Sequence, residues 1–397
     1  MRDVIEETLR GPSVFKDESK LGFDYVPDEL PHREDEMREM TRQMRSVFEE
    51  GTQQSMLVRG PVGSGKTALS KRFCREFERA ADSREINLET VHVNCRRRST
   101  TSSALLQIVN EFDPGFPDRG FSTTEMLEQL AKQLKRNRSH LIVVLDEVDV
   151  LIKRDDADLV YHLTRFNEET GGGEFGVSVI LVSQENVRLL MDEGTKSTFK
   201  QTNTLQLDAY GAEELGSIAE QRVDLAFHPN TVQDGVVDLV ADLASEDGDA
   251  RFAIELLHEA GQAADERSED QVVPEHVRAA KAHIHPVILD ERLEELDEQH
   301  ALTLLGVARV LDRGGAYAKT GDVKSAYEAA CEEFDAEPRG HTQFWTYIQD
   351  LDALGLIEAK RSGEGVVGTT TLMSLPDAPA HQIEEHLGER LEAGEIA

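Results

Sequence analysis

The stretch Gly60-Pro61-Val62-Gly63-Ser64-Gly65-Lys66-Thr67 fits the pattern GxxxxGK[ST] without a gap. An apolar run, Ser55–Arg59, precedes it, and a helical pattern follows it to about Ala80. Glycines let successive backbone N–H groups converge on phosphate oxygens without Cβ clashes, and the positive end of the next helix adds to the anion site. We therefore predict a phosphate-binding loop whose cradle is Gly60, Gly63, Ser64 and Gly65. Lys66 would reach the β- and γ-phosphates, and the Thr67 hydroxyl would ligate Mg²⁺.

A buried strand and two acidic residues would complete such a site. His140–Leu145 is apolar along most of its length and leads directly into Asp146 and Glu147. A phosphate loop needs a carboxylate at the tip of a neighbouring strand, on the metal side of the nucleotide. We expect Asp146 to hold Mg²⁺ through water and Glu147 to polarise the attacking water. The alternative is that both acids only cap the next helix.

Strand-like and helical segments alternate through the first half of the chain, which predicts βαβ units and a parallel sheet of the α/β class. The expected strands are Ser55–Arg59, Thr90–Cys95, His140–Leu145, Val177–Ser183 and Thr204–Leu207. Fully buried parallel strands are almost wholly apolar, as the runs LIVVL and VSVILV are. A helix over Thr123–Leu134 would begin at a capping box formed by Ser122 and Glu125.

The pattern changes twice beyond this region. From about 211 to 285 it is helical only, and then helical segments at 300–312, 321–334 and 341–354 precede an extended stretch, a turn and a second strand near 369–375. Three helices followed by a β-hairpin form the layout of a winged helix. We expect a mobile or helical N-terminal arm at 1–20, a nucleotide-binding core at 21–210, an all-helical lid at 211–285 and a winged-helix domain at 286–397.

Acidic residues dominate the composition. The chain has 77 Asp and Glu against 43 Lys and Arg, which gives a formal net charge of −34. One interpretation is an acidic protein that avoids nucleic acid. The other is a protein of a high-salt cytoplasm, where the self-repulsion is screened within a few ångströms. The acids are spread along the chain and Lys is scarce relative to Arg, which favours the halophilic interpretation. The charge therefore does not exclude a nucleic-acid partner.

The sequence indicates neither a membrane protein nor a disulfide framework. No apolar run reaches about 18 residues, and the N-terminus has no apolar signal-peptide region. The three cysteines form no CxxC pair. We expect a cytoplasmic protein that does not bind a membrane.

Three further motifs surround the phosphate loop. Tyr25–Glu34 reads YVPDELPHRE, Val93–Arg96 reads VNCR, and Gly248–Ala253 reads GDARFA. Together with the paired acids after an apolar strand, they resemble the archaeal origin-recognition initiators, AAA+ ATPases related to the eukaryotic origin-recognition and cell-division-control proteins. With the charge, they point to a haloarchaeal member of that family. The resemblance implies an AAA+ core, a helical lid and a C-terminal winged helix.

The resemblance also assigns nucleotide contacts outside the loop. Tyr210 and Arg222 stand where the family contacts the nucleotide, and Arg251 stands where a lid arginine faces the γ-phosphate; the alternative for Arg251 is a solvated helix residue. Two positions depart from the family pattern. Gln184 replaces the usual asparagine after the fourth strand, and Gly194 stands in place of the arginine finger. Such a finger supplies about 10³–10⁵ in rate, so we expect tight ATP or ADP binding and a weak ATPase.

Candidate DNA contacts lie in the last domain and in an insertion after the second strand. Gly340–Leu354 would be the recognition helix, with Thr342 and Gln343 facing the groove, and Lys360 and Arg361 would contact phosphates from the wing. The resemblance places a DNA-contacting insertion at the densest basic run of the chain, Arg96, Arg97 and Arg98. The alternatives are a winged helix that binds protein and a solvated basic loop.

The recognition helix also carries an apolar face. Phe344, Ile348 and Leu351 share one side of the helix, which predicts core packing. Trp345, the single tryptophan, is also expected in the core rather than stacked on a base.

Two functions remain open at this stage. The first is an ATP-dependent replication initiator that binds double-stranded origin DNA, with the replicative helicase and other initiator copies as partners. The second is a divergent nucleotide-switched regulator or scaffold whose winged helix binds protein partners.

Overall fold

The computed structural model describes residues 13–50, 52–153, 158–170, 175–187, 203–284, 293, 296–361, 371–376, 378–393 and 396. Gly194, the turn of the wing and the side chain of Arg361 lie outside the described residues. The chain divides into two compact units. We call Val26–Tyr210 with Gly248–Ala250 the core unit, and the segment before Val26, Gly211–Asp247 and the residues after Ala250 the lid-and-wing unit.

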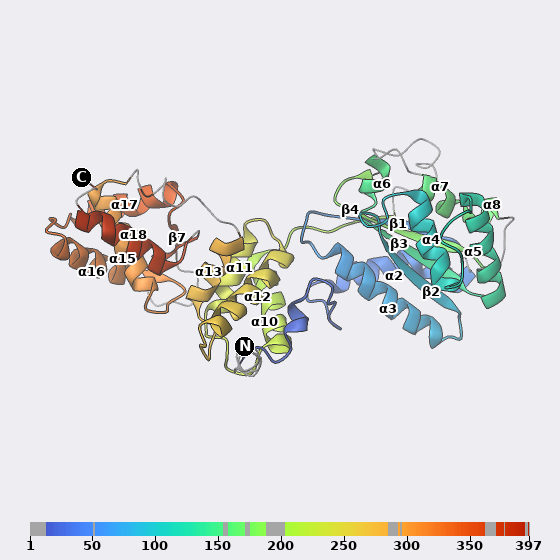
Figure 1. Cartoon of the computed structure of the whole chain (residues 1–397), viewed down its shortest axis with the longest axis horizontal. Helices are drawn as coiled ribbons and strands as arrows, with labels where there is room; N and C mark the ends of the chain where they lie inside the picture. The colour runs from blue at the N-terminus through green and yellow to red at the C-terminus, as the bar shows by residue number, and fades with distance from the viewer. Residues whose placement is uncertain are drawn as a thin grey trace, which may run out of the picture. The chain divides into compact units, whose positions relative to one another are not determined.

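A parallel sheet forms the centre of the core unit. Among the described residues its strands are β1 (Ser55–Arg59), β2 (Leu88–Asn94), β3 (His140–Asp146), β4 (Val177–Ser183) and β5 (Thr204–Gln206), in the order β2-β3-β4-β1-β5. Figure 1 labels the first four of them. The register places Asn94 beside Asp146, and Asp146 beside Val182. All strands of a parallel sheet end at the same edge, so the residues that follow them meet there. The predicted α/β class is confirmed.

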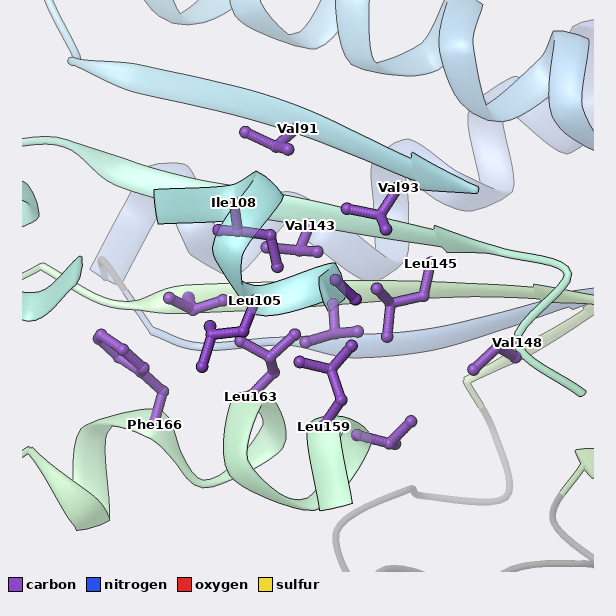
Figure 2. Packing of buried hydrophobic residues seen from close by; sticks show 14 of the residues in the cluster. Val91, Val93, Leu105, Ile108, Val143, Leu145, Val148, Leu159, Leu163 and Phe166 are labelled. Atoms are coloured by element: carbon purple, nitrogen blue, oxygen red, sulfur yellow. The ribbon is translucent and has the colours of Figure 1, made fainter. Parts of the chain in front are cut away.

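The sheet is buried on both faces because alternate strand residues enter two apolar clusters. Ile142 and Val144 of β3 lie in one cluster with residues of α2 (Glu34–Glu50) and α3 (Lys66–Asp82). Val143 and Leu145 lie in the other (Figure 2). The helices that contribute to this second cluster are α4 (Thr101–Phe112), α5 (Thr123–Asn137), α6 (Asp149–Lys153), α7 (Asp158–Thr164) and α8 (Phe166–Glu169). Truncation of one such Leu to Ala costs about 2–5 kcal/mol, so the clusters hold the strand ends rigidly.

The start of α5 confirms the predicted capping box. Ser122 N donates to Glu125 Oε2 at 2.8 Å, and Glu125 N donates to Ser122 Oγ at 3.3 Å. The two backbone donors would otherwise lack partners in the first turn. The helices α7 and α8 are not among our predictions, since their four to seven residues are too short to show a helical period.

Among its described residues, the lid-and-wing unit is mainly helical up to residue 311 and mixed beyond it. Its first elements are η1 (Glu18–Leu21), α10 (Ala212–Ala226), α11 (Val236–Ser245), α12 (Ala250–Glu266) and α13 (Pro274–Ile284). The winged helix follows as α15 (Glu298–Leu311), β6 (Ala318–Lys319), α16 (Thr320–Glu333), α17 (His341–Ala353), β7 (Glu358–Arg361), β8 (Thr371–Ser374) and α18 (Ala380–Ala393). Its antiparallel sheet has the order β6-β8-β7. Phe344, Ile348 and Leu351 are buried in its core, as predicted, and Trp345 packs partly buried against them.

The described part of the N-terminal arm packs on the lid helices. Phe15 and Phe227 have ring centroids 4.9 Å apart. A Cβ on Gly261 would lie 2.2 Å from the Phe15 ring, so this helix must carry glycine for the ring to approach. The backbone N–H groups of Lys16 and Asp17 donate to the carbonyl of Ala226. No helix of the described residues is long and apolar enough to cross a bilayer.

Candidate nucleotide site

The phosphate loop joins β1 to α3, in the strand-loop-helix context that the sequence predicts. Gly65 has φ +81°, and a Cβ there would lie 2.7 Å from Tyr210 Oη. Gly63 has φ +69°, and a Cβ there would lie 1.9 Å from Asp249 Oδ1. Only glycine fits at either position. Within the described chain no side chain caps the first turn of α3, and the start of a helix favours an anion such as phosphate.

The side chains of Lys66 and Ser64 donate hydrogen bonds to backbone carbonyl groups of the phosphate loop itself. Lys66 Nζ donates to the carbonyl oxygens of Gly60, at 2.9 Å, and Pro61, at 2.5 Å. Ser64 Oγ donates to the same Pro61 carbonyl at 2.9 Å. The ammonium group therefore lies at the loop itself, where phosphate oxygens can replace carbonyl oxygens as its acceptors.

The structure brings Thr67 and Asp146 together. Thr67 Oγ1 donates to Asp146 Oδ2 at 2.7 Å, and Asp146 is 3% exposed. His92 Nε2 lies 3.4 Å from the same carboxylate oxygen, and burial lowers the pKa of His92, which favours the neutral ring. A hydroxyl and a carboxylate are the hard oxygen donors that Mg²⁺ takes in sites where phosphates supply the other ligands. The residues present therefore fit a magnesium–nucleotide complex.

Glu147 occupies a constrained position beside this pair. Its backbone has φ +56°, which is uncommon for a residue with a side chain. Its N–H donates to Asp146 Oδ1 at 3.1 Å, and its carboxylate accepts from Arg96 Nε at 2.5 Å. Asn94 Oδ1 in turn accepts from the N–H groups of Arg96 and Arg97. Arg96, which we predict as a DNA contact, thus contacts the proposed catalytic base, a pairing that no sequence pattern indicates.

Gln184 directly follows β4, and its side chain is exposed. Ser183, the last residue of the strand, donates through Oγ to Asp149 Oδ1 at 2.9 Å, and Glu185 pairs with Lys153. Side-chain contacts therefore flank Gln184 on both sides. Its role in orienting water stays a prediction.

The three predicted nucleotide contacts outside the loop fall in different units. Tyr210 belongs to the core unit, is buried, and has its hydroxyl beside Gly65. Arg222 lies in the lid-and-wing unit, where it donates to the carbonyl of Lys20 at 2.7 Å and lies over the Tyr25 ring. Burial lowers the pKa of the Arg222 guanidinium. Arg251 is exposed in that same unit, 5.8 Å from the centroid of Phe23.

Arg33 is a residue of this site that our sequence analysis does not single out. It is 5% exposed, and it donates to the carbonyl of Ser64 in the loop and to the hydroxyl of Tyr210. The motif YVPDELPHRE contains it, but Tyr210 lies 177 residues further along the chain. Its buried position is therefore visible only in the tertiary structure.

The candidate DNA contacts are exposed, as contacts for an external partner must be. Thr342 and Gln343 lie in the first turn of α17, and Arg97 and Arg98 follow β2. Lys360 is already paired within the molecule. Its Nζ lies 3.5 Å from Asp242 of α11 and 3.3 Å from Glu358 of β7. DNA binding through these residues stays a prediction.

The fold and the site together define a class of protein. A parallel-sheet core carries a phosphate loop with an adjacent strand-end carboxylate, and a helical lid and a winged helix follow it. Three family descriptions match in the same order: "AAA domain" at residues 49–191, "Cdc6 AAA+ ATPase-type lid domain" at 216–282 and "CDC6, C terminal winged helix domain" at 291–385. The protein is therefore an AAA+ ATPase-type chain with a winged-helix domain.

One relative has nearly the same length. The chain is 31% identical over 388 residues to the ORC1-type DNA replication protein 2 of Sulfolobus acidocaldarius, a match that covers 95% of this chain and 93% of the relative. The chain belongs to the Cdc6/ORC1-type family of AAA+ replication initiators. The resemblance drawn from the motifs is thereby confirmed at the level of the family.

Two solved structures of the family extend this likeness. The Aeropyrum pernix ORC1 protein in complex with DNA has a TM-score of 0.62 at 33% identity, over 96% of this chain and 99% of that chain. The Aeropyrum pernix ORC2 protein, solved as ADPNP-ADP complexes, has a TM-score of 0.64 at 26% identity, over 96% and 99%.

Proposed function

We propose that this initiator binds ATP in the phosphate loop and duplex origin DNA through its winged helix and the basic segment after β2. The observation that carries the proposal is the 2.7 Å contact between Thr67 Oγ1 and Asp146 Oδ2 at the end of the loop. Two residues 79 positions apart meet where an ATPase needs its metal ligands. The solved DNA complex and nucleotide complexes of family members support both ligands.

Each residue of the site has a defined task in this proposal. Lys66 and the N–H groups of α3 bind phosphate oxygens, and Thr67 and Asp146 hold the magnesium ion, which neutralises charge on the phosphates. Glu147 orients and polarises the attacking water once Arg96 releases its carboxylate. Because Gln184 and Gly194 replace an asparagine and an arginine finger, we propose slow hydrolysis. Bound ATP then acts as a long-lived switch for helicase loading.

Titration calorimetry of the full chain with magnesium-ATP in molar KCl tests the nucleotide half. We expect saturable binding by the native chain and at least about tenfold weaker binding by Lys66→Ala, since a charge-assisted contact to phosphate is lost. Lys135→Ala, an exposed lysine of α5, is the matched control and should bind as the native chain does. Absence of ATP and ADP binding by the folded native chain would refute the proposal.

Mapping of chromatin bound by the chain in its own host tests the DNA half, and the recovered duplexes then serve for titrations at matched salt. We expect discrete sites and weaker binding when Arg97 and Arg98 are both replaced by Ala, because each phosphate contact adds to affinity. If the native chain and Lys66→Ala both ignore every duplex, DNA binding is wrong.

A second function is favoured by one observation. Lys360 is held by Asp242 and Glu358, and α17 exposes Asp350 and Asp352. A face of this charge suits a cationic protein partner, as in a nucleotide-switched regulator or scaffold. This alternative predicts normal ATP binding with no duplex recovered from chromatin.

We also propose that the protein works in a cytoplasm of high salt. With a formal net charge of −34, carboxylate repulsion opposes compaction until counterions screen it. Circular dichroism across a KCl series should show cooperative structure only toward molar salt. Full structure at low ionic strength would contradict this proposal.

A further inference from the structure

Arg33 is a buried cation whose guanidinium contacts three separate elements. Nε donates to Tyr210 Oη at 3.0 Å, one terminal nitrogen donates to the carbonyl of Ser64 at 3.1 Å, and the other donates to Glu36 Oε1 at 3.0 Å. The guanidinium carbon also lies 4.0 Å from the centroid of the Tyr210 ring. A buried charge is tolerated only when such partners are all in place. Arg33 therefore fixes the loop carbonyl and the tyrosine relative to each other.

Tyr210 also contacts a second segment, Gly248–Ala250. Its hydroxyl lies against Gly65, and its N–H donates to the carbonyl of Gly248 at 3.1 Å. Gly248 has φ +63°, and a Cβ there would lie 2.6 Å from Ala209 and 2.9 Å from Tyr210 N, so the two segments are in close contact.

The segment Gly248–Ala250 also contacts the phosphate loop. Ala250 N donates to the carbonyl of Gly63 at 3.2 Å, and Asp249 lies directly against Gly63. The contacts close a ring that runs from Arg33 to Ser64 and Gly63, on to Ala250 and Gly248, and through Tyr210 back to Arg33. A displacement of the loop carbonyls must therefore displace Tyr210 and Gly248–Ala250 as well.

These segments hold three of the four places where the chain passes from one compact unit to the other, and the fourth lies between Tyr25 and Val26. The core unit ends at Tyr210, takes in Gly248–Ala250, and gives way to the lid-and-wing unit at Gly211 and Arg251. The crossings at Tyr210 and at Gly248–Ala250 thus belong to the same ring of hydrogen bonds as the phosphate loop.

We propose that Arg33 is a positioning residue that transmits occupancy of the phosphate loop to the chain crossings at Tyr210 and at Gly248–Ala250. This inference rests on the proposed ATP binding. Arginine is required because its planar fork donates in three fixed directions, whereas a lysine ammonium is a point charge that cannot reach all three acceptors in one geometry. Arg33 acts through Ser64 and Tyr210 and does not contact the reacting atoms.

Hydrogen exchange of the full chain with and without magnesium-ATP tests this role, with calorimetry run on the same samples. In the native chain, ATP should slow exchange at residues 209–211 and 248–251. Arg33→Gln should bind ATP about tenfold more weakly and, at saturating ATP, lose most of that protection. Arg33→Lys should restore the affinity in part but not the protection. Arg38→Gln is the matched control, because Arg38 is exposed on α2 and pairs only with a surface carboxylate in the described chain.

The outcomes separate this inference from the proposed function. If the native chain binds no ATP, the proposed function fails. If it binds ATP but Arg33→Gln keeps native affinity and native protection at saturation, Arg33 has no positioning role. If Arg33→Gln does not fold, Tyr210→Phe removes one link of the ring and leaves the ring's packing. It should lower ATP-dependent protection by about threefold, and unchanged protection overturns the inference.

Discussion

The phosphate site and the candidate DNA surface differ in how their polar groups are held. In the phosphate site the decisive groups are buried and bonded to each other, as Thr67 is to Asp146 and Arg33 is to Ser64. On the candidate DNA surface, two of the cations are exposed and paired with acids of the same chain, Arg96 with Glu147 and Lys360 with Asp242. The first site is organised by folding alone. Under the proposed function, the second would exchange intramolecular carboxylates for DNA phosphates, so its DNA binding would depend on salt.

Replacement of Glu147 by Gln should have the largest effect, on ATP turnover at the phosphate site, and it also removes the carboxylate that pairs with Arg96. Loss of a general base lowers rates by about 10²–10⁴-fold, while Gln keeps the size of the side chain and does not change Lys66 or Thr67. Phosphate release should cease and calorimetric ATP binding should persist. Normal turnover by Glu147→Gln would show that the catalytic base is another residue.

Phe344→Ala should destabilise the winged-helix domain, because it removes a side chain from the core of that domain. The ring is fully buried against Tyr327, with centroids 5.2 Å apart, and its loss costs about 3–5 kcal/mol. Trp345, the single tryptophan, reports this unfolding by fluorescence. ATP binding by the core unit should survive. Thr342→Ala, at an exposed site on the same helix, is the control and should melt as the native chain does.

Acid should weaken the core unit through His140. Burial lowers its pKa to about 4, below the value of about 6.5 in an unfolded chain. Above pH 6.5 both states are neutral at this residue. As the pH falls from about 6.5 to 4, only the unfolded state takes up the proton, so up to about 3 kcal/mol of stability is lost.

Urea unfolding at fixed high salt measures this loss. His140→Gln retains an amide for the Ser178 hydroxyl, which lies 2.9 Å from the imidazole, but removes the titration. Its stability should therefore fall less steeply with acid than that of the native chain. Equal slopes for both proteins would contradict the assignment.

Asp242→Asn should give the smallest effect, a small rise in duplex affinity. It should reduce the difference between the two regions, because it removes one of the acids that pair with the cations of the candidate DNA surface. The substitution frees Lys360 from one carboxylate and removes one negative charge, and exposed pairs contribute about 0–1 kcal/mol. Duplex affinity should rise about two- to threefold. Glu220→Gln, at an exposed position of α10, removes the same charge elsewhere. An equal gain in Glu220→Gln would mean that only net charge matters.

Local patterns predicted much of the fold. The capping box of Ser122 and Glu125, the apolar strand before Asp146 and the apolar face of Phe344 and Ile348 each arise from residues close in sequence. The helix α18 and the two-residue strand β6 are not among our predictions. The first lies beyond the expected hairpin, and the second is too short to show any period.

The sequence by itself determined the phosphate loop, the strand-end acids and the order of the three domains, because each depends on a motif or a period within a few residues. Only the tertiary structure decided where the long-range polar partners lie. Arg222 meets Lys20 across 202 positions, Arg33 meets Tyr210 across 177, and Lys360 meets a helix of the lid. No local period encodes such pairs, because they form only after the strands and helices have packed, and the buried guanidinium groups of Arg33 and Arg222 must then find acceptors.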